Sequence, residues 1–323
     1  MSRRSVVAVD PPISYRRPGP PAAVFFRNLQ IFRIPDLRGA NAETLQTRLA
    51  AFGFQPCGSL APESRGWISP RGDDRLIYTS TGHWLLALGT EEKLLPASVV
   101  RQTVEQRAAD LEARTGFKPS RKRLRDLRDE VTGELLPRAF SRYRTTWCWI
   151  DPEGGWLVVD GATTKRADEL TEWLNRSSDL FEFERMATAV SATAAMTEWL
   201  TQRAGPSGFT IDRECVLQSA MEERSTVRYT HHSLVDNDEV ANHIRGGKVP
   251  VQLALTWEDR LSFVLTDKLE VKKLAFLDIV RGDRPQDAAS ADEQFESDFA
   301  LMVAMLGRFL VELTETLGGW KAQ

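Results

Sequence analysis

The sequence predicts an α+β protein with a central antiparallel or mixed sheet, an inserted helical tip and a C-terminal α+β base domain. Apolar residues alternate at 24–34 and again at 146–160, which is typical of strands. Two amphipathic helical stretches fill 96–136 between them, and apolar runs at 249–280 indicate a three-stranded meander. A chain of 323 residues is long enough for two domains or three small ones.

The N-terminal part is expected to begin with a flexible tail at residues 1–22. Its five prolines and four arginines leave little to bury, and its apolar run is too short for a signal peptide. The elements expected after the strand at 24–34 are a helix at 41–54 with an asparagine N-cap, a loop at 56–70, and a hairpin with strands at 76–79 and 84–88 that turns at Thr81–Gly82.

Residues 96–136 are predicted to form two helices separated by a break at 116–119. Pro96 suits a helix start and Pro137 ends the second helix. The second helix carries a basic run and only a thin apolar stripe, so we expect it to be covered on one side.

The order of strands and helix then repeats, with strands at 146–150 and 156–160 and a helix at 165–175. This repetition predicts one central sheet domain, residues 23–95 and 137–185, interrupted by the tip at 96–136. The remaining residues, 186–323, form the predicted base domain. Its expected elements are two short helices, strand pieces at 215–223 and 227–234, the meander at 249–280 and a closing helix at 295–317.

The composition argues against a membrane-spanning protein, a disulfide-rich protein and a cysteine-based zinc protein. The formal net charge is −3 and the pI about 5.9. No window approaches eighteen consecutive apolar residues, so no membrane span is expected. The three cysteines are too few and too scattered for a disulfide framework or a cysteine-based zinc site. A reduced, cytoplasmic protein is predicted.

No catalytic residue, metal site or cofactor is predicted. The segment HIRGGKVP at 243–250 has glycines that follow a helix, so a helix C-cap explains them better than a phosphate loop. His231, His232 and His243 are possible metal ligands, but His231 and His232 are adjacent, and adjacent residues on a strand face opposite sides, which disfavours a metal site. Asp151 and Asp160 flank a hairpin and are interpreted as turn residues.

One segment is strongly basic despite the acidic total. Residues 114–144 hold ten Lys or Arg against four Asp or Glu, a local charge of +6, which leaves −9 for the other residues. Arginine binds phosphate through a forked geometry, and several such contacts give affinity without reading base sequence. The alternative is a solvated face with ion pairs to Asp126, Asp129 and Glu130. The predicted DNA-binding residues are Lys118, Arg121, Lys122, Arg123, Arg125, Arg128, Arg138, Arg142 and Arg144.

Several segments, in order along the chain, are similar to one known family. They include FFRNLQIFRI at 25–34, GWISP at 66–70, DEVTGELLPRAFSRYRTTWCWID at 129–151 and NHIRGGKVPVQLALTWEDRLSFVL at 242–265. Over roughly residues 24–320 the chain resembles the bacterial recombination-associated protein RdgC family.

That resemblance implies a nucleoid-associated DNA-binding protein and no enzyme. It implies a homodimer closed into a ring around duplex DNA, binding of single- and double-stranded DNA without sequence preference, and restraint of the RecA recombinase. Phe140 matches an aromatic at one dimer contact of the family, with stacking on an unpaired base as the alternative. His231 and His232 replace a lysine-glutamine pair at the other contact, which predicts pH-sensitive closure.

Two other classes of function stay open from the residues alone. One is a metal-dependent DNA enzyme such as a nuclease, which needs clustered carboxylates. The other is a protein-interaction scaffold whose basic helix binds an acidic partner. The steepness of salt dependence separates the scaffold from a DNA-binding protein.

Overall fold

The computed structural model describes residues 24–35, 37, 39–180, 182–219, 225–236, 238–277 and 290–321. The predicted tail at 1–22 lies outside these residues. Helices and a 12-stranded sheet make up the described chain, which confirms the predicted α+β class. Within the same ranges, no helix is both long and apolar enough to cross a membrane.

The chain divides into two compact units. Residues 55–64 and 91–142 belong to the first unit, and residues 24–54, 65–90 and 143–321, apart from the gaps above, belong to the second. Strands β4 (His83–Leu94) and β5 (Phe140–Asp151) each pass from one unit into the other. The domain boundaries predicted from sequence stay a prediction.

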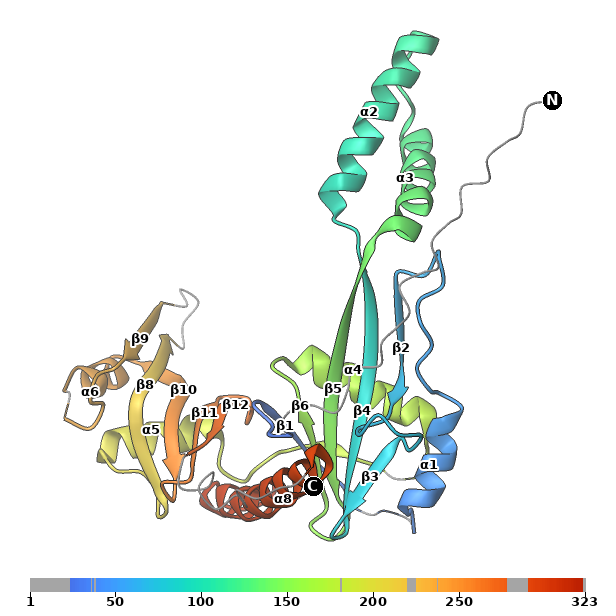
Figure 1. Ribbon diagram of the computed structural model, residues 1–323. Coiled ribbons are helices and arrows are strands. Elements are labelled where there is room, and N and C mark those ends of the chain that lie inside the picture. The colour runs from blue at the N-terminus through green and yellow to red at the C-terminus, as the bar shows by residue number, and fades with distance from the viewer. Residues whose placement is uncertain are drawn as a thin grey trace. The chain divides into compact units, whose positions relative to one another are not determined.

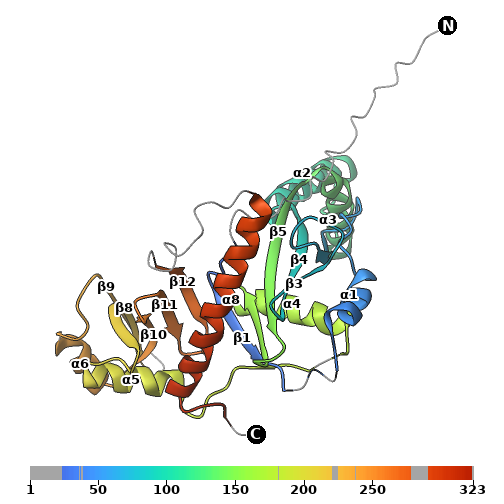
Figure 2. The same ribbon diagram turned by 60° about the horizontal axis from the view of Figure 1, so that its bottom comes forward.

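The first unit contains the two helices predicted for residues 96–136. They are α2 (Ala97–Thr115) and α3 (Arg121–Leu135), which lie side by side in both views and lead into the short 3₁₀ helix η1 (Leu136–Arg138) (Figures 1 and 2). Pro96 is the N-cap of α2, and Gly116 ends that helix with a positive φ of 77°, a conformation that glycine adopts without strain. The predicted start, break and end of this helical segment are confirmed.

One sheet carries all of the named strands. Its order is β2-β4-β5-β6-β1-β12-β11-β10-β8-β9, with β3 paired to β4 and β7 paired to β1. The remaining strands are β1 (Leu29–Arg33), β2 (Glu63–Ile68), β3 (Ile77–Ser80), β6 (Trp156–Asp160), β7 (Glu184–Arg185), β8 (Phe209–Ser219), β9 (Thr226–Thr230), β10 (Lys248–Trp257), β11 (Leu261–Thr266) and β12 (Val271–Phe276).

Two hydrophobic cores in the second unit hold helices against the sheet. One core packs α1 (Ala42–Ala50) and α4 (Thr164–Ser177) against strands that include β5 and β6. The other packs α5 (Ala192–Gln202) and α8 (Ala291–Thr316) against β8, β10, β11 and β12, and Figure 2 shows α8 running beside β11 and β12. Phe299 and Phe309 of α8 are fully buried, and each such side chain contributes about 1.5–3 kcal/mol. The helix α6 (Asp238–Arg245) contributes Val240 to this core.

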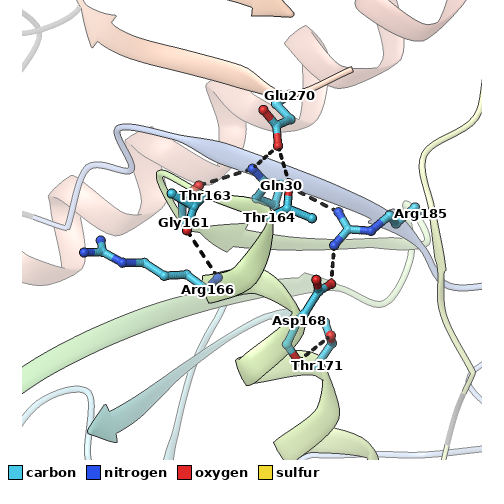
Figure 3. A network of polar contacts seen from close by, with 9 residues as sticks. All are labelled: Gln30, Gly161, Thr163, Thr164, Arg166, Asp168, Thr171, Arg185 and Glu270. Carbon is cyan, nitrogen blue, oxygen red and sulfur yellow. Dashed lines mark hydrogen bonds and ion pairs between the residues drawn. The ribbon is translucent and has the colours of Figure 1, made fainter. Parts of the chain in front are cut away.

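A buried polar network lies where β1 meets β12, which pair antiparallel at Leu29 and Val271. Gln30 of β1 and Thr164 of α4 both donate hydrogen bonds to the carboxylate of Glu270, at 2.9 and 2.8 Å (Figure 3). Arg185 donates to the Gln30 side-chain oxygen and also pairs with Asp168 of α4. The network therefore connects β1, α4 and the turn before β12 through side chains.

Several predicted elements are confirmed in position. The side chain of Asn41 caps α1 by accepting a hydrogen bond from the Thr44 N–H at 2.9 Å. The β3–β4 hairpin turns at Thr81 and Gly82, both with positive φ. The other confirmed elements are the β5–β6 hairpin, α4, α5, α6 and the strands β10, β11 and β12.

Other boundaries differ from the prediction. The first strand begins at Leu29 rather than at residue 24, and α1 ends at Ala50, before Phe52 and Gly53. The predicted loop at 56–70 is wrong over β2, because Gly66, taken as a loop signal, lies within that strand. A Cβ at Gly66 would come within 2.3 Å of the Phe54 Cα, so glycine serves there for close backbone approach.

The closing helix is longer than predicted, since α8 begins at Ala291, four residues earlier, with Ser290 as its N-cap. The strand at 227–234 is also shorter than predicted. It ends at Thr230, so His231 and His232 lie in the bend that follows and not on opposite faces of a strand.

Candidate nucleic-acid interface

The helix α3 presents most of the predicted basic residues. Ser120 caps it, accepting a hydrogen bond from the Arg123 N–H at 3.3 Å. Leu127 and Val131 are its buried residues, four positions apart on one face. Because this apolar stripe is narrow, the rest of the helix surface is left to charged side chains, as expected from the sequence.

Six of the nine predicted DNA-binding residues are exposed and form no ion pair with any described residue. They are Lys118, Arg121, Lys122, Arg125, Arg128 and Arg138. Of the alternative ion pairs, those to Asp126 and Asp129 do not form within the described chain, whereas the pair to Glu130 does form, through Arg123.

The other three predicted residues pair with carboxylates. Arg123 bonds Glu130 on the same helix at 2.8 Å, and Arg142 bonds Glu92 of β4. Arg144 belongs to the second unit, where it bonds Glu169 of α4 at 2.7 Å and is half-buried. Eight of the nine predicted DNA-binding residues therefore lie in the first unit. Arg144 is the exception, since it lies in the second unit and pairs there with Glu169.

A groove of about 410 Å³ runs between the two helices of the first unit. From α2 it is lined by Arg101, Val104, Glu105 and Ala108. From α3 it is lined by Arg121, Leu124, Arg125 and Arg128. Both sets follow i, i+3, i+4, i+7 spacing, so each is one helix face. The groove has four guanidinium groups against one carboxylate, with small apolar side chains between them.

A cross-helix ion pair connects α2 and α3. Arg107 donates to both carboxylate oxygens of Glu134, one at 3.0 Å. The Arg107 hydrogen bonds hold the pKa of the exposed Glu134 carboxyl below its usual value and raise the pKa of the guanidinium. The pair therefore stays charged across the physiological range and links the surfaces of the two helices.

Two phenylalanines of this unit are exposed to solvent. Phe140, the first residue of β5, is 85% exposed, and Phe117, in the turn between α2 and α3, is 80% exposed. Both rings are flanked by basic residues in the sequence. An exposed ring beside cations can pack across a protein contact or stack on a nucleic-acid base.

The remaining candidate residues lie in the second unit. His231 and His232 are exposed, and His231 has a positive φ of 62°. His243 of α6 lies beside the Tyr229 ring. Among the described residues, no group of three or more His, Cys, Asp or Glu side chains is placed to hold a metal ion.

Arg101 and Phe117 are not among the residues predicted from sequence. Arg101 lies outside the basic run. Its spacing to Val104 and Ala108 places all three residues on one face of a helix, and this pattern could have identified Arg101 from the sequence. The exposure of Phe117 has no such signal, because an aromatic residue between two amphipathic helices is equally compatible with a buried turn.

Comparison with known proteins identifies relatives over nearly the whole described chain. The model of the RdgC family, described as "Putative exonuclease, RdgC", matches residues 24–320. The chain is 46% identical to the recombination-associated protein RdgC of Dechloromonas aromatica over 298 residues, which cover 92% of this chain and 98% of that protein. It is 45% identical to the protein of the same name from Herminiimonas arsenicoxydans, covering 93% of this chain and 100% of the relative. The chain belongs to the RdgC family of recombination-associated proteins.

Proposed function

We propose that this protein binds DNA without sequence preference and acts in recombination by occupying the DNA. The observation that carries the proposal is the set of exposed guanidinium groups on α2 and α3 that lack a carboxylate partner among the described residues. Unneutralised arginines at this density attract a polyanion, and each phosphate contact releases condensed counterions. Such contacts give affinity for any DNA sequence.

The active form in this proposal is a homodimer closed into a ring around duplex DNA. Phe140 supplies one contact between copies, and His231 with His232 lie at the second. A ring gives long retention on DNA from individually weak phosphate contacts, because dissociation then requires opening of a protein contact. A bound ring also denies DNA to a RecA-type recombinase, and the proposed location is the cytoplasmic nucleoid.

The first test is a gel-shift assay with linear and circular duplexes of unrelated sequence, read beside the mass of the free protein in solution. Dimeric mass with binding to every sequence supports the proposal. A monomer that ignores DNA at low ionic strength contradicts it.

An exonuclease activity is the second candidate, favoured by the description attached to the family model. The same duplexes incubated with Mg²⁺ test it directly. Progressive loss of DNA from its ends in a purified preparation supports degradation. Intact DNA under those conditions, with a retained gel shift, supports occupancy alone.

A further inference from the structure

We propose that the α2–α3 groove and Phe117 form a subsite for single-stranded DNA, with phosphates on the groove arginines and an unpaired base stacked on the Phe117 ring. This inference rests on the proposed DNA binding and names the form of DNA that this site takes. It adds two residues, Arg101 and Phe117, to the candidate interface.

The groove suits a linear polyanion better than an isolated phosphate. Arg121, Arg125 and Arg128 lie on one face of α3, spread over about 10 Å of helix axis at 1.5 Å per residue. They form a row along one wall, and Arg101 of α2 supplies a positive charge on the other. A row of forked donors matches successive phosphates of a strand.

The apolar surface between the arginines has no partner in the described chain. Val104, Ala108 and Leu124 line the groove, and Leu124 is 37% exposed. A folded protein partner would need several carboxylates to match the four guanidinium groups of the groove, and Asp and Glu are depleted at the centre of protein–protein contacts. Sugar and base carbons of a flexible strand fit such a surface, since their phosphates reach the arginine rim.

Phe117 is held in place by the turn that carries it. Gly116 closes α2, and the Phe117 N–H donates to the Thr115 hydroxyl at 3.4 Å. That hydroxyl donates in turn to the Leu111 carbonyl at 2.8 Å, and Pro119 restricts the following backbone. A ring presented on a constrained turn loses little conformational entropy on stacking.

Charge around the ring favours a nucleic-acid partner. Residues 114–128 contain seven Lys or Arg and one Asp, a local charge of +6. Unpaired bases expose a π-face, whereas the bases of a duplex already stack on one another. Phe117 should therefore contribute to single-strand binding and not to duplex binding.

The test is fluorescence anisotropy with three labelled probes of equal length: a dT oligonucleotide, an abasic oligonucleotide and a duplex. We expect Phe117→Ala to weaken dT binding about fivefold or more, the effect of losing one stacked base. Its affinities for the abasic strand and the duplex should equal those of the wild type. Phe117→Tyr should retain the preference for dT over the abasic strand.

Two further variants complete the design. Leu60→Ala removes another exposed apolar side chain of the same unit, 67% exposed, and should change none of the three affinities. Arg101→Glu should weaken dT and abasic strands equally, because it acts on phosphate. Thermal melting of each variant verifies that the fold is retained.

Three outcomes overturn the inference. They are an equal loss of affinity by Phe117→Ala on dT and abasic strands, no loss on any probe, and a reduced oligomeric mass of this variant, which assigns the ring to a contact between copies. If the wild type binds none of the probes, the proposed function itself fails. If the wild type binds the probes and Phe117→Ala binds them equally well, DNA binding is supported and only the proposed subsite is rejected.

Discussion

The side-chain amide of Gln30 on β1 donates a 2.9 Å hydrogen bond to the carboxylate of Glu270, 240 residues later in the chain (Figure 3). Both side chains are buried, with 2% and 6% of their surface exposed. Lys272 pairs with the second oxygen of the Glu270 carboxylate at 2.9 Å. This contact joins β1 to the turn before β12 in the interior of the sheet, where the backbone pairing of the two strands is short.

Loss of the Glu270 carboxylate should destabilise the second unit. In Glu270→Ala the buried Gln30 amide loses the shorter of its two hydrogen bonds and keeps the 3.4 Å bond to the Gly161 carbonyl. An unsatisfied buried polar group costs about 1–3 kcal/mol. Urea unfolding should show a lower free energy by that amount. Glu153→Ala, at an exposed turn, is the control and should change the free energy by less than about 0.5 kcal/mol. Equal stabilities of the two variants would contradict the role given to the network.

The same carboxylate predicts a dependence of stability on pH. Burial alone would raise the pKa of Glu270, but hydrogen bonds from Lys272, Gln30 and Thr164 hold it below the ordinary value. A depressed folded-state pKa adds stability above the unfolded-state value of about 4.3, and this is lost as the pH falls through the folded-state pKa. Stability of the wild type should fall more steeply than that of Glu270→Gln from about pH 5 downward. Parallel pH profiles from urea unfolding would exclude this linkage.

Gly66 should not tolerate a side chain. A Cβ there would approach the Phe54 Cα to 2.3 Å and the Gly53 carbonyl carbon to 2.7 Å. Both are backbone atoms, so either strand β2 or the segment Gly53–Phe54 must move. Gly66→Ala should lower the free energy of unfolding by about 1–3 kcal/mol or more. Gly58→Ala is the matched control, because a Cβ at that position meets no atom within 4 Å. Equal melting temperatures for both variants would show that β2 adjusts at no cost.

The features predicted from sequence are those with local physical causes. The Asn41 cap, the Thr81–Gly82 turn and the Gly116 helix end each depend on a few neighbouring residues. The prediction of a loop at Gly66 is wrong because the need for glycine there comes from the backbone of Phe54. The two residues are separated in the sequence and come close only in the fold. The ion pair of Arg144 with Glu169 is likewise invisible before the sheet and α4 are in place.

In the candidate interface, too, only the features with a local cause can be predicted from the sequence. A basic run is visible in composition, so Arg121 and Arg125 were predicted. The groove exists only where α2 and α3 lie side by side, which composition does not reveal, so the sequence does not predict Arg101 as part of it. Exposure of Phe117 is a property of the folded surface and cannot be read from its neighbours.

Removal of the Phe140 ring should weaken the proposed dimer contact. The ring is 85% exposed in one copy, so Phe140→Ala removes little packing within the chain. A central aromatic at an interface carries about 2 kcal/mol or more, equivalent to a roughly 30-fold weaker dimer. Sedimentation equilibrium measures the change. Val311→Ala, an exposed apolar residue of α8, is the control. Unchanged dimer affinity in Phe140→Ala would contradict the dimer contact and favour the alternative, in which the Phe140 ring stacks on an unpaired base.

In the proposed function, arginines of the α2–α3 hairpin neutralise DNA phosphates. The most direct measurement of this neutralisation is duplex affinity as a function of salt concentration for the wild type and for the triple variant Arg121→Glu, Arg125→Glu, Arg128→Glu. A matched charge change is provided by Arg48→Glu, Arg75→Glu and Arg203→Glu, exposed residues of the second unit whose surface ion pairs contribute little.

The wild type and the matched variant should both show a steep negative slope of duplex affinity against salt concentration on every sequence. The triple variant should bind more weakly, and its slope should be shallower by about 0.9 for each phosphate that is no longer neutralised, so by up to about 3. Identical slopes for all three proteins, or no binding of the wild type at low salt, would contradict this proposal.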